Sequence, residues 1–321
     1  MAFGRRHFLK SSAAFATLAG TPLLWSCSAE QTSAVTCNST SDYGVQLFMF
    51  RDSFAKDQKG TLANIAAMGF SQVEPFGLGG FIGIPGAPFF GLSIDELATT
   101  LQALNLKTPT AHVSGKLDDL NHTNELATKL GIDYFIEPLA EELLAFDNGK
   151  VSITVPDSVD KVLHMAERIN LRGKKFHDQG FGFAYHNHHM EFTKVEGKTI
   201  LDWLMENTDP NYVKLQLDLG WVAVADVAPL EALKKYGKRV IGCHMKDRDY
   251  HVQVSPGDSE QLMPEALQVK APGQGGIDFT PILAYLDEHN IQNRYVEVDV
   301  TATPYEDARF GLAHLQNVCR K

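Results

Sequence analysis

The feature that most constrains the fold is a regular alternation of short β-rich segments with amphipathic helical segments from Tyr43 onward. Eight segments have the composition of buried strands: residues 43–50, 70–76, 108–114, 133–139, 182–188, 213–219, 240–246 and 294–299. The segments between them place apolar residues three and four positions apart, which indicates helices. Because a helix after each strand returns the chain to the same end of the sheet, the strands are predicted to be parallel. Eight such units predict a single-domain (β/α)₈ TIM barrel over residues 43–321.

Helix caps support these assignments, and the sequence lacks the turn that defines the main alternative fold. Ser93 with Glu96, Ser158, and Thr280 followed by Pro281 are predicted to begin helices. A doubly wound dinucleotide-binding sheet needs a glycine-rich turn after its first strand, and residues 49–57 contain no glycine. The glycine-rich residues 76–86 follow the second strand without opening a helix, so we expect a mobile loop at the barrel mouth.

The N-terminal segment predicts export rather than a part of the fold. Residues 1–27 combine Arg5 and Arg6 with a weakly apolar segment and resemble a twin-arginine signal peptide, with an ordinary secretory signal as the alternative. Residues 24–27 resemble a lipoprotein processing site with Cys27 as the lipidated residue, although Trp25 fits it poorly. Residues 28–42 predict a tether. We therefore expect a periplasmic protein that contacts the membrane only through its signal or a lipid anchor.

Composition narrows the class of partner. The formal net charge of −10 and the scattered Lys and Arg residues argue against a nucleic-acid partner, which would require a basic surface. The four cysteines are Cys27, Cys37, Cys243 and Cys319, and processing at Cys27 leaves an odd number. A disulfide framework is therefore not expected, and Cys243 is predicted to be an inert core residue. The sequence does not indicate an oligomeric state.

Polar residues in the predicted strands share one parity. Side chains alternate along a strand, so one parity faces the barrel interior. The interior set comprises Gly182, Ala184, His186, His188, Gln216, Asp218, His244, Lys246, Tyr295, Glu297 and Asp299. Glu74 and His112 also lie late in their strands. Since active sites of this fold occupy the C-terminal ends of the strands, we expect Asp218, His244, Glu297, His186, His188 and Glu191 to converge there.

Converging carboxylates would repel one another unless a positive charge neutralised them. A divalent cation is the simplest source, and a mixed set of carboxylates and imidazoles suits Mn²⁺, Co²⁺, Zn²⁺ or Fe²⁺ better than Ca²⁺. Taken singly, each residue also has a structural interpretation: His112 as a hydrogen-bonded core residue, Asp218 as a loop cap, and Glu297 as a partner of Lys246.

These residues carry a resemblance to a known family. The segments VEPFG with Glu74, AYHNHHMEF at 184–192, LDLGW at 217–221, CHMKD at 243–247, GQGGIDF at 273–279 and YVEVD at 295–299 resemble the sugar phosphate isomerase/epimerase group of xylose isomerase-like TIM barrels. The resemblance covers about Tyr43 to Val318 and implies one divalent metal ion. Carried over residue by residue, it implies the ligands Asp218, His244 and Glu297.

The fifth-strand ligand departs from the family pattern, because many relatives have Glu where this chain has His186. Either His186 binds the metal itself or Glu191 supplies the missing carboxylate, and we favour Glu191. The resemblance further implies a base among Glu297 and Glu191, a partner acid among His188 and Glu74, and Lys246 at the oxyanion. We expect His112, His186 and Trp221 to contact substrate.

The implied function is proton abstraction next to a carbonyl by a metal-dependent sugar isomerase, epimerase or lyase. Export implies a free keto-sugar or 3-keto-glycoside as substrate, because phosphorylated sugars are largely kept in the cytoplasm. The alternatives are a non-catalytic sugar-binding lipoprotein and a phosphodiester hydrolase resembling endonuclease IV, which the acidic charge disfavours.

Overall fold

The computed structural model describes residues 42–78, 92–113, 120–254 and 262–318. The predicted signal peptide, most of the tether, Cys27, Cys37, Cys319 and most of the glycine-rich segment lie outside these ranges.

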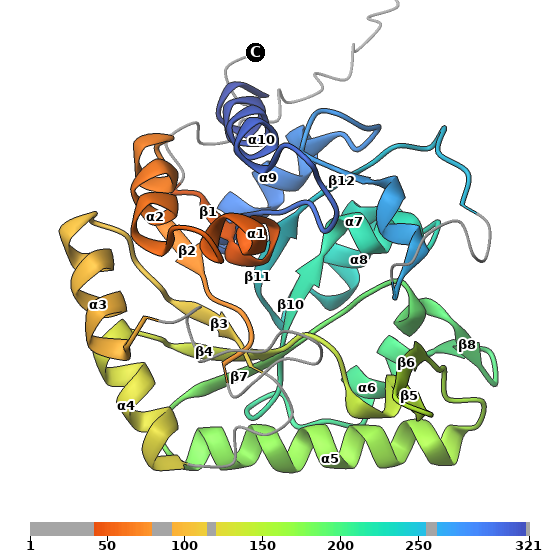
Figure 1. Cartoon of the computed structure of the whole chain (residues 1–321). Coiled ribbons are helices and arrows are strands. Elements are labelled where there is room, and N and C mark those ends of the chain that lie inside the picture. The colour runs from red at the N-terminus through yellow and green to blue at the C-terminus, as the bar shows by residue number, and fades with distance from the viewer. Residues whose placement is uncertain (1–41, 79–91, 114–119, 255–261, 319–321) are drawn as a thin grey trace, which may run out of the picture. The chain divides into compact units, whose positions relative to one another are not determined.

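Eight parallel strands form the central sheet (Figure 1). They are β1 (Gly44–Gln46), β2 (Gln72–Glu74), β3 (Thr110–His112), β4 (Tyr134–Glu137), β7 (Gly182–His186), β10 (Lys214–Asp218), β11 (Val240–Met245) and β14 (Asn293–Val296). Their order is β2-β1-β14-β11-β10-β7-β4-β3. Parallel bridges from Gln72 to Lys107 and from Leu78 to Val113 join β2 to β3 and close the ring. The predicted TIM barrel is confirmed.

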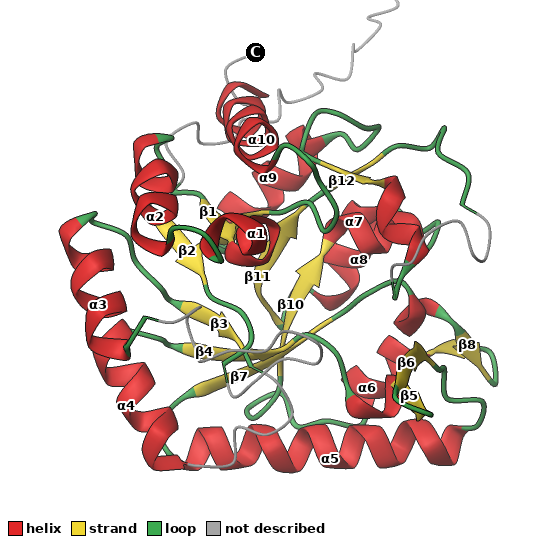
Figure 2. Cartoon of the chain, viewed as in Figure 1, coloured by secondary structure: helices red, strands yellow, loops and turns green. Residues whose placement is uncertain are grey.

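Helices surround the strands, as Figure 2 shows. They are α1 (Arg51–Phe54), α2 (Gln58–Ala67), α3 (Ile94–Ala103), α4 (Leu120–Leu130), α5 (Val159–Asp178), α6 (Ile200–Glu206), α7 (Leu219–Val224), α8 (Pro229–Tyr236), α9 (Phe279–Glu288) and α10 (Pro304–Val318). The predicted capping box is present, because the Ser93 and Glu96 side chains each accept a hydrogen bond from the other residue's backbone N–H. Such reciprocal caps satisfy donors that the first helical turn leaves free.

Short 3₁₀ helices and two-stranded antiparallel pairs lie between the main strands and helices. The 3₁₀ helices are η1 (Leu47–Phe50), η3 (Glu141–Leu143), η4 (Met190–Phe192) and η5 (Pro264–Gln268). The antiparallel pairs are β5 (Leu144–Asp147) with β6 (Lys150–Ile153), β8 (Lys194–Val195) with β9 (Lys198–Thr199), and β12 (Asp247–Arg248) with β13 (Val269–Lys270).

Two local predictions are wrong. The first strand ends at Gln46 rather than at residue 50, because the Gln46 side chain accepts a hydrogen bond from Phe48 N and caps η1. Helix α9 begins two residues earlier than predicted, since Asp278 rather than Thr280 is the capping residue and its side chain accepts a hydrogen bond from Thr280 N. In both cases a polar side chain that precedes the predicted boundary accepts a backbone hydrogen bond from the first helical turn.

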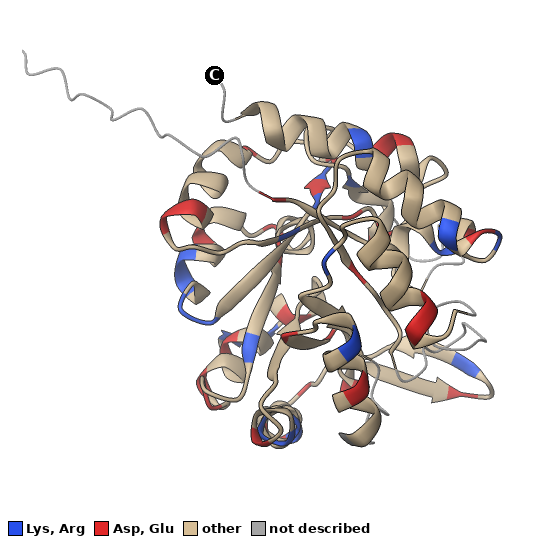
Figure 3. Cartoon of the chain, turned by 90° about the vertical axis from the view of Figure 1, so that its left-hand side faces the viewer, with Lys and Arg blue, Asp and Glu red and all other residues tan. Residues whose placement is uncertain are grey.

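The apolar core lies between the strands and the helices, while the barrel interior is polar. Phe135, Phe176 and Phe183 pack together between β4, β7 and α5, as the outward parity predicts. Cys243 is fully buried, as predicted. In Figure 3, acidic and basic residues are interspersed over the described ribbon. Within the described ranges, no helix is long and apolar enough to cross a bilayer.

Candidate active site

Glu74 lies in the centre of the barrel interior, at the end of β2. Its Oε2 accepts hydrogen bonds from Gln46 Nε2 at 2.7 Å and His244 Nε2 at 2.6 Å. Its Oε1 accepts hydrogen bonds from Gln216 Nε2 at 2.6 Å and from Thr110 Oγ1. The side chain is fully buried, with protein donors at both oxygens. This geometry is that of a positioning residue, and the expected role of Glu74 as a partner acid stays a prediction.

Asp218, His244 and Glu297 meet at the ends of three neighbouring strands, β10, β11 and β14. Each offers one ligand atom, and the three atoms lie within 4.8 Å of one another. His244 Nδ1 is 2.7 Å from Glu297 Oε2 and 3.8 Å from Asp218 Oδ2. All three residues are buried. The structure therefore brings together the three residues that the family resemblance implies as metal ligands.

Lys246 contributes a positive charge to the same acids. Its Nζ lies 2.9 Å from Asp218 Oδ2, 2.8 Å from Glu297 Oε2 and 2.9 Å from both oxygens of Asp299. The side chain is 1% exposed. The predicted pairing of Glu297 with Lys246 is thus present in the same structure as the three-residue group.

His112 and His186 are joined through Gln216 on β10. Gln216 Oε1 lies 2.8 Å from His112 Nε2 and 2.9 Å from His186 Nδ1. The His112 ring stacks on His244 with centroids 5.2 Å apart, and His186 meets His244 edge-on at 4.5 Å. His186 Nε2 faces Asp218 Oδ2 at 3.4 Å. His112, His186 and His244 form a second group whose ring nitrogens are close enough to hold a metal ion.

Burial and charge act in opposite directions on the acids and bases of the site. Burial lowers the pKa of His244, but the carboxylates of Glu74 and Glu297 outweigh it and raise that pKa to about 10. Burial likewise lowers the pKa of Lys246, but Asp218, Asp299 and Glu297 raise it well above its usual value. A carboxylate within hydrogen-bond distance favours the charged form of an imidazole or an ammonium group. The metal-free site therefore holds two cations against its carboxylates.

The same ion pairs lower the pKa of two carboxyl groups of the site, Asp218 and Glu297. Burial raises the pKa of Asp218, but Lys246, His186 and His244 together outweigh it and lower that pKa well below its usual value. Lys246 and His244 together do the same for Glu297. The exception is Asp299, because burial raises its pKa to about 6 in spite of Lys246.

Glu191 is not brought into this group. Its Oε1 accepts a hydrogen bond from Tyr185 Oη at 2.6 Å, and its Oε2 accepts one from His188 N at 2.9 Å. Among the described residues, Glu191 belongs to neither of the two groups whose ligand atoms lie within 4.8 Å of one another. Burial raises the pKa of Glu191 to about 7. These contacts indicate that Glu191 orders the chain after β7, and its expected role as a metal ligand stays a prediction.

His188 and Trp221 lie beside one another at the edge of the site. Their ring centroids are 5.4 Å apart, and Lys246 Nζ lies 5.7 Å from the centroid of the Trp221 ring. Trp221 is fully buried and packs with Val224 and Val269, so it does not present a flat exposed surface to a sugar ring in this structure. His188 has no hydrogen bond from its ring to any described residue, and burial lowers its pKa well below its usual value.

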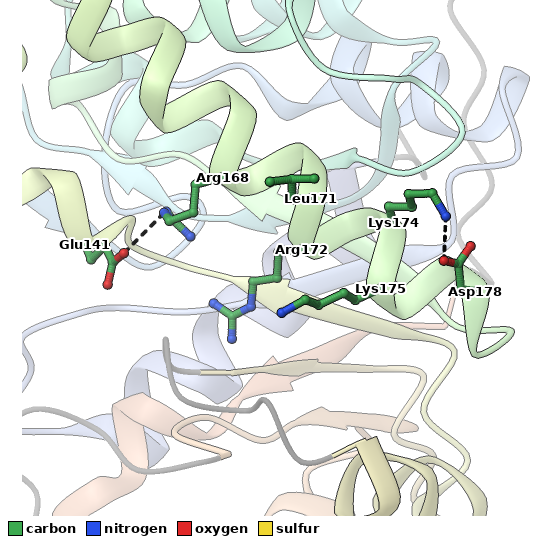
Figure 4. Close-up of a pocket in the computed structure, with 7 residues that line it drawn as sticks. All are labelled: Glu141, Arg168, Leu171, Arg172, Lys174, Lys175 and Asp178. Carbon is green, nitrogen blue, oxygen red and sulfur yellow. Dashed lines mark hydrogen bonds and ion pairs between the residues drawn. The ribbon is translucent and has the colours of Figure 1, made fainter.

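A separate groove of about 490 Å³ runs along α5, outside the barrel (Figure 4). Its lining includes Arg168 and Lys174, which form ion pairs with Glu141 and Asp178. Arg168 also binds Glu137 at the end of β4. The groove combines charged surface residues with none of the histidines of the barrel interior, and we do not assign the site to it.

The family assignment follows from a direct comparison. The model of the family described as xylose isomerase-like TIM barrel matches residues 62–318. This chain belongs to that family.

Relatives of this xylose isomerase-like barrel include named enzymes. Inosose dehydratase of Clostridium perfringens is 35% identical over 143 residues, which are 44% of this chain and 47% of that protein. Inosose dehydratase of Salmonella typhimurium is 32% identical over 163 residues, which are 49% of this chain and 54% of that protein. The matched part thus spans about half the length of these curated relatives.

Solved structures share the fold over nearly the whole xylose isomerase-like barrel. A sugar phosphate isomerase/epimerase from Parabacteroides distasonis has a TM-score of 0.66 at 20% identity and covers 85% of this chain and 97% of that chain. The 3-keto-D-glucoside 4-epimerase YcjR from E. coli has a TM-score of 0.59 at 17% identity and covers 86% and 99%. At these identities the likeness shows the fold.

The residues of this xylose isomerase-like barrel fit a divalent metal ion. Two carboxylates and an imidazole from Asp218, Glu297 and His244 converge in a buried position. Asp218 Oδ2 is buried and accepts no hydrogen bond. Its charge is balanced by an ion pair with Lys246. Such a donor set suits first-row metal ions, which bind carboxylate oxygen and imidazole nitrogen together.

Several residues of the site were not selected from the sequence. Gln216 and Asp299 were placed on the inward parity but given no role, and Gln46 and Thr110 were not singled out. A polar side chain at an inward position of a barrel strand was the available indication, and it applies equally to Gln46, Thr110 and Gln216. Their partners lie on other strands, so their roles could not be assigned from the pattern.

Proposed function

We propose that this chain is a divalent-metal-dependent sugar isomerase, epimerase or lyase that removes a proton next to a carbonyl of a keto-sugar or 3-keto-glycoside. The observation that supports it best is the convergence of Asp218, His244 and Glu297 within 4.8 Å at the C-terminal ends of the barrel strands. Active sites of this fold occupy that end. Relatives named inosose dehydratase support an enzyme that modifies a sugar or cyclitol.

Asp218, His244 and Glu297 are the residues that would hold the metal ion. When bound, such an ion polarises a carbonyl and stabilises negative charge that develops on its oxygen. Lys246 shares Asp218 and Glu297 with the proposed ion, whereas its contact with Asp299 is independent of them. We propose that Asp299 retains the Lys246 ammonium beside the site, where it donates a hydrogen bond to substrate oxygen.

His188 is the best-supported candidate for the residue that moves the proton. Its ring is bonded to no described side chain, and its lowered pKa keeps it neutral at pH 7. A neutral imidazole has a free electron pair that can accept a proton, and a positioned base contributes roughly 10²- to 10⁴-fold to the rate. Glu74 and Glu191 have both oxygens engaged by protein donors. Glu297, the other base that we considered, would hold the metal ion and stays an alternative candidate.

Export remains part of the proposal. The twin-arginine-like Arg5 and Arg6 lead us to propose a periplasmic enzyme that acts on unphosphorylated substrates, with Cys27 as a lipid anchor. Replacing both arginines with lysine should retain the protein in the cytoplasm, measured by cell fractionation. Periplasmic recovery of that double variant would contradict a twin-arginine route.

The activity is tested with the mature protein, a panel of free ketoses and 3-keto-glycosides, and NMR in D₂O. We expect turnover that a chelator abolishes and that added Mn²⁺ or Co²⁺ restores, with solvent deuterium entering one carbon of the product. Deuterium at one position identifies the proton that was removed. The His244→Ala variant should be inactive.

The same experiment distinguishes the main alternative, a sugar-binding lipoprotein. A binding protein would retain its sugar affinity in the presence of a chelator and in His244→Ala, with no exchange of deuterium in any substrate. That combination of results would refute the enzymatic proposal.

A further inference from the structure

The orientation of the Gln216 amide is fixed by its neighbour Glu74. Gln216 Nε2 lies 2.6 Å from Glu74 Oε1. A carboxylate only accepts hydrogen bonds, so the amide nitrogen must be the atom that faces Glu74. If the amide were rotated by half a turn, its oxygen would lie against a carboxylate oxygen in a fully buried position. The Gln216 oxygen therefore faces the opposite way, toward the two histidines.

This orientation determines which ring nitrogens carry protons. Gln216 Oε1 lies 2.9 Å from His186 Nδ1 and 2.8 Å from His112 Nε2. An amide oxygen only accepts, so both nitrogens donate. In a neutral imidazole with its proton on Nδ1, the other nitrogen carries a lone pair. His186 therefore presents an unprotonated Nε2 to whatever lies in front of it.

The atom in front of His186 Nε2 is a carboxylate oxygen. Asp218 Oδ2 lies 3.4 Å away, and the two side chains are 2% and 0% exposed. A proton between them would give a charge-assisted hydrogen bond, and such bonds are about 2.7–2.9 Å long. Asp218 Oδ2 instead accepts no hydrogen bond from His186 and is paired with the Lys246 ammonium at 2.9 Å. Two electron-pair donors thus face one another in a buried site, separated by a distance that two ligands of one metal ion can span.

We infer that His186, through Nε2, is the fourth protein ligand of the metal ion, beside Asp218, His244 and Glu297, and that Gln216 is the positioning residue that sets its tautomer. This inference rests on the proposed function, which supplies the metal ion. It replaces our expectation that Glu191 completes the set. Metal-bound histidines commonly donate their second ring nitrogen to a fixed acceptor, and Gln216 Oε1 provides that acceptor here.

The same geometry decides against the alternative group of three histidines. His112 Nε2 is engaged as a donor to Gln216 and lies 3.1 Å from Glu74 Oε2. It would have to give up both contacts to bind a metal. His244 Nε2 likewise lies 2.6 Å from Glu74 Oε2, which leaves Nδ1 on the side of Asp218 and Glu297. We therefore assign His112 to positioning.

The assignment has a consequence for metal selectivity. Two imidazoles and two carboxylates carry a charge of −2 and include two nitrogen donors, whereas Glu191 in place of His186 would give three carboxylates and −3. Imidazole nitrogen favours Zn²⁺, Co²⁺ or Fe²⁺ over Mg²⁺ and Ca²⁺. We expect Co²⁺ to bind more tightly than Mg²⁺.

The test is Co²⁺ titration of the metal-free protein by calorimetry, with folding of each variant checked by circular dichroism. His186→Gln should weaken Co²⁺ binding more than the roughly 10- to 100-fold that is typical of losing a residue outside the first ligand layer. Gln216→Met keeps His186 but removes its acceptor, and should weaken binding within that 10- to 100-fold range. The matched control, Glu191→Gln, should bind Co²⁺ as the unsubstituted protein does.

The outcomes separate this inference from the proposed function. If the unsubstituted protein binds neither Co²⁺ nor Mn²⁺, the metal-dependent function fails. If it binds Co²⁺ and His186→Gln binds equally well, or if Glu191→Gln alone loses the metal, only the inference is refuted. Should His186→Gln fail to fold, pulsed EPR of the unsubstituted protein with bound Cu²⁺ and ¹⁵N-labelled histidine provides a second test. Two coordinated imidazoles support the inference, and one overturns it.

Discussion

At the residue scale, the site is held together by a continuous set of interactions through side chains of different charge. Glu297 contacts His244, His244 contacts Glu74, and Glu74 accepts from Gln216. Buried carboxylates and imidazoles are unfavourable alone, and they are tolerated here because each has a partner. Substrate chemistry can then rely on side chains that do not need to reorganise when substrate binds.

The buried histidines predict acid sensitivity of the metal-free protein. Burial and the neighbouring His244 lower the pKa of His186 from an ordinary 6.5 to about 4. Between these values the unfolded chain binds the proton and the folded chain does not. His186 should therefore contribute a fall of about 3 kcal/mol in the free energy of unfolding as the pH decreases from about 6.5 to about 4. Glu191 and Asp299, whose pKa values are raised, act in the opposite direction over this range.

Urea unfolding of the metal-free protein at a series of pH values measures this decrease. The His186→Gln variant should lack the His186 contribution, so its pH profile should differ from that of the unsubstituted protein by about 3 kcal/mol over this range. His177→Gln, on the exposed surface of α5, should behave like the unsubstituted protein. An identical pH dependence in His186→Gln would show that another group controls acid unfolding.

At the element scale, Asp247 connects β12 to the loop that follows β13. Its Oδ2 accepts hydrogen bonds from the backbone N–H groups of Gly273 and Gly275, and its Oδ1 accepts from those of Arg248 and Ile277. Gly273 has φ +87°, and a Cβ there would lie 2.3 Å from the His314 ring. The Asp247 side chain therefore binds the GQGGID segment to the HMKD segment at the mouth of the barrel.

Replacing Asp247 with Asn should release this loop. The Asn amide nitrogen cannot accept, so two part-buried backbone donors would lose their partner, at an expected cost of about 2 kcal/mol in the free energy of unfolding. Hydrogen exchange followed by mass spectrometry should show faster exchange at Gly273, Gly275 or Ile277. Asp249→Asn, which alters a single bond to His251 N, is the control. Unchanged exchange in Asp247→Asn would contradict this role.

At the scale of the whole molecule, barrel closure brings together residues that are far apart in sequence. Glu74 is 142 residues from Gln216 and 170 from His244. A metal ion that binds only the closed barrel should therefore stabilise the entire described fold rather than one segment.

Thermal unfolding with and without Co²⁺ tests this coupling. Binding to the folded state alone should raise the free energy of unfolding by about 2.7 kcal/mol when the free ion is at 100 times its Kd. The midpoint of unfolding should rise accordingly, and His244→Ala should show no rise. A chelator added to the Co²⁺-loaded protein should reverse the effect. If Co²⁺ leaves the midpoint of the unsubstituted protein unchanged, the proposed coupling is absent.

The sequence by itself determined the number and order of the barrel strands and the parity of their side chains. Both are recorded locally, because a strand alternates with a period of two residues and an amphipathic helix with a period near 3.6. That information sufficed to place His186, Gln216, Asp218, His244 and Glu297 on the interior face. It also sufficed for the family, since the motifs are short and contiguous.

The tertiary structure alone decided which partner each polar side chain takes. Glu191 follows β7 by only a few residues, yet its carboxylate turns to Tyr185 and the backbone of His188. Gln216 acquires its role from Glu74 and two histidines on other strands. Hydrogen-bond geometry and burial depend on neighbours brought in by barrel closure, and no local period in the sequence records them.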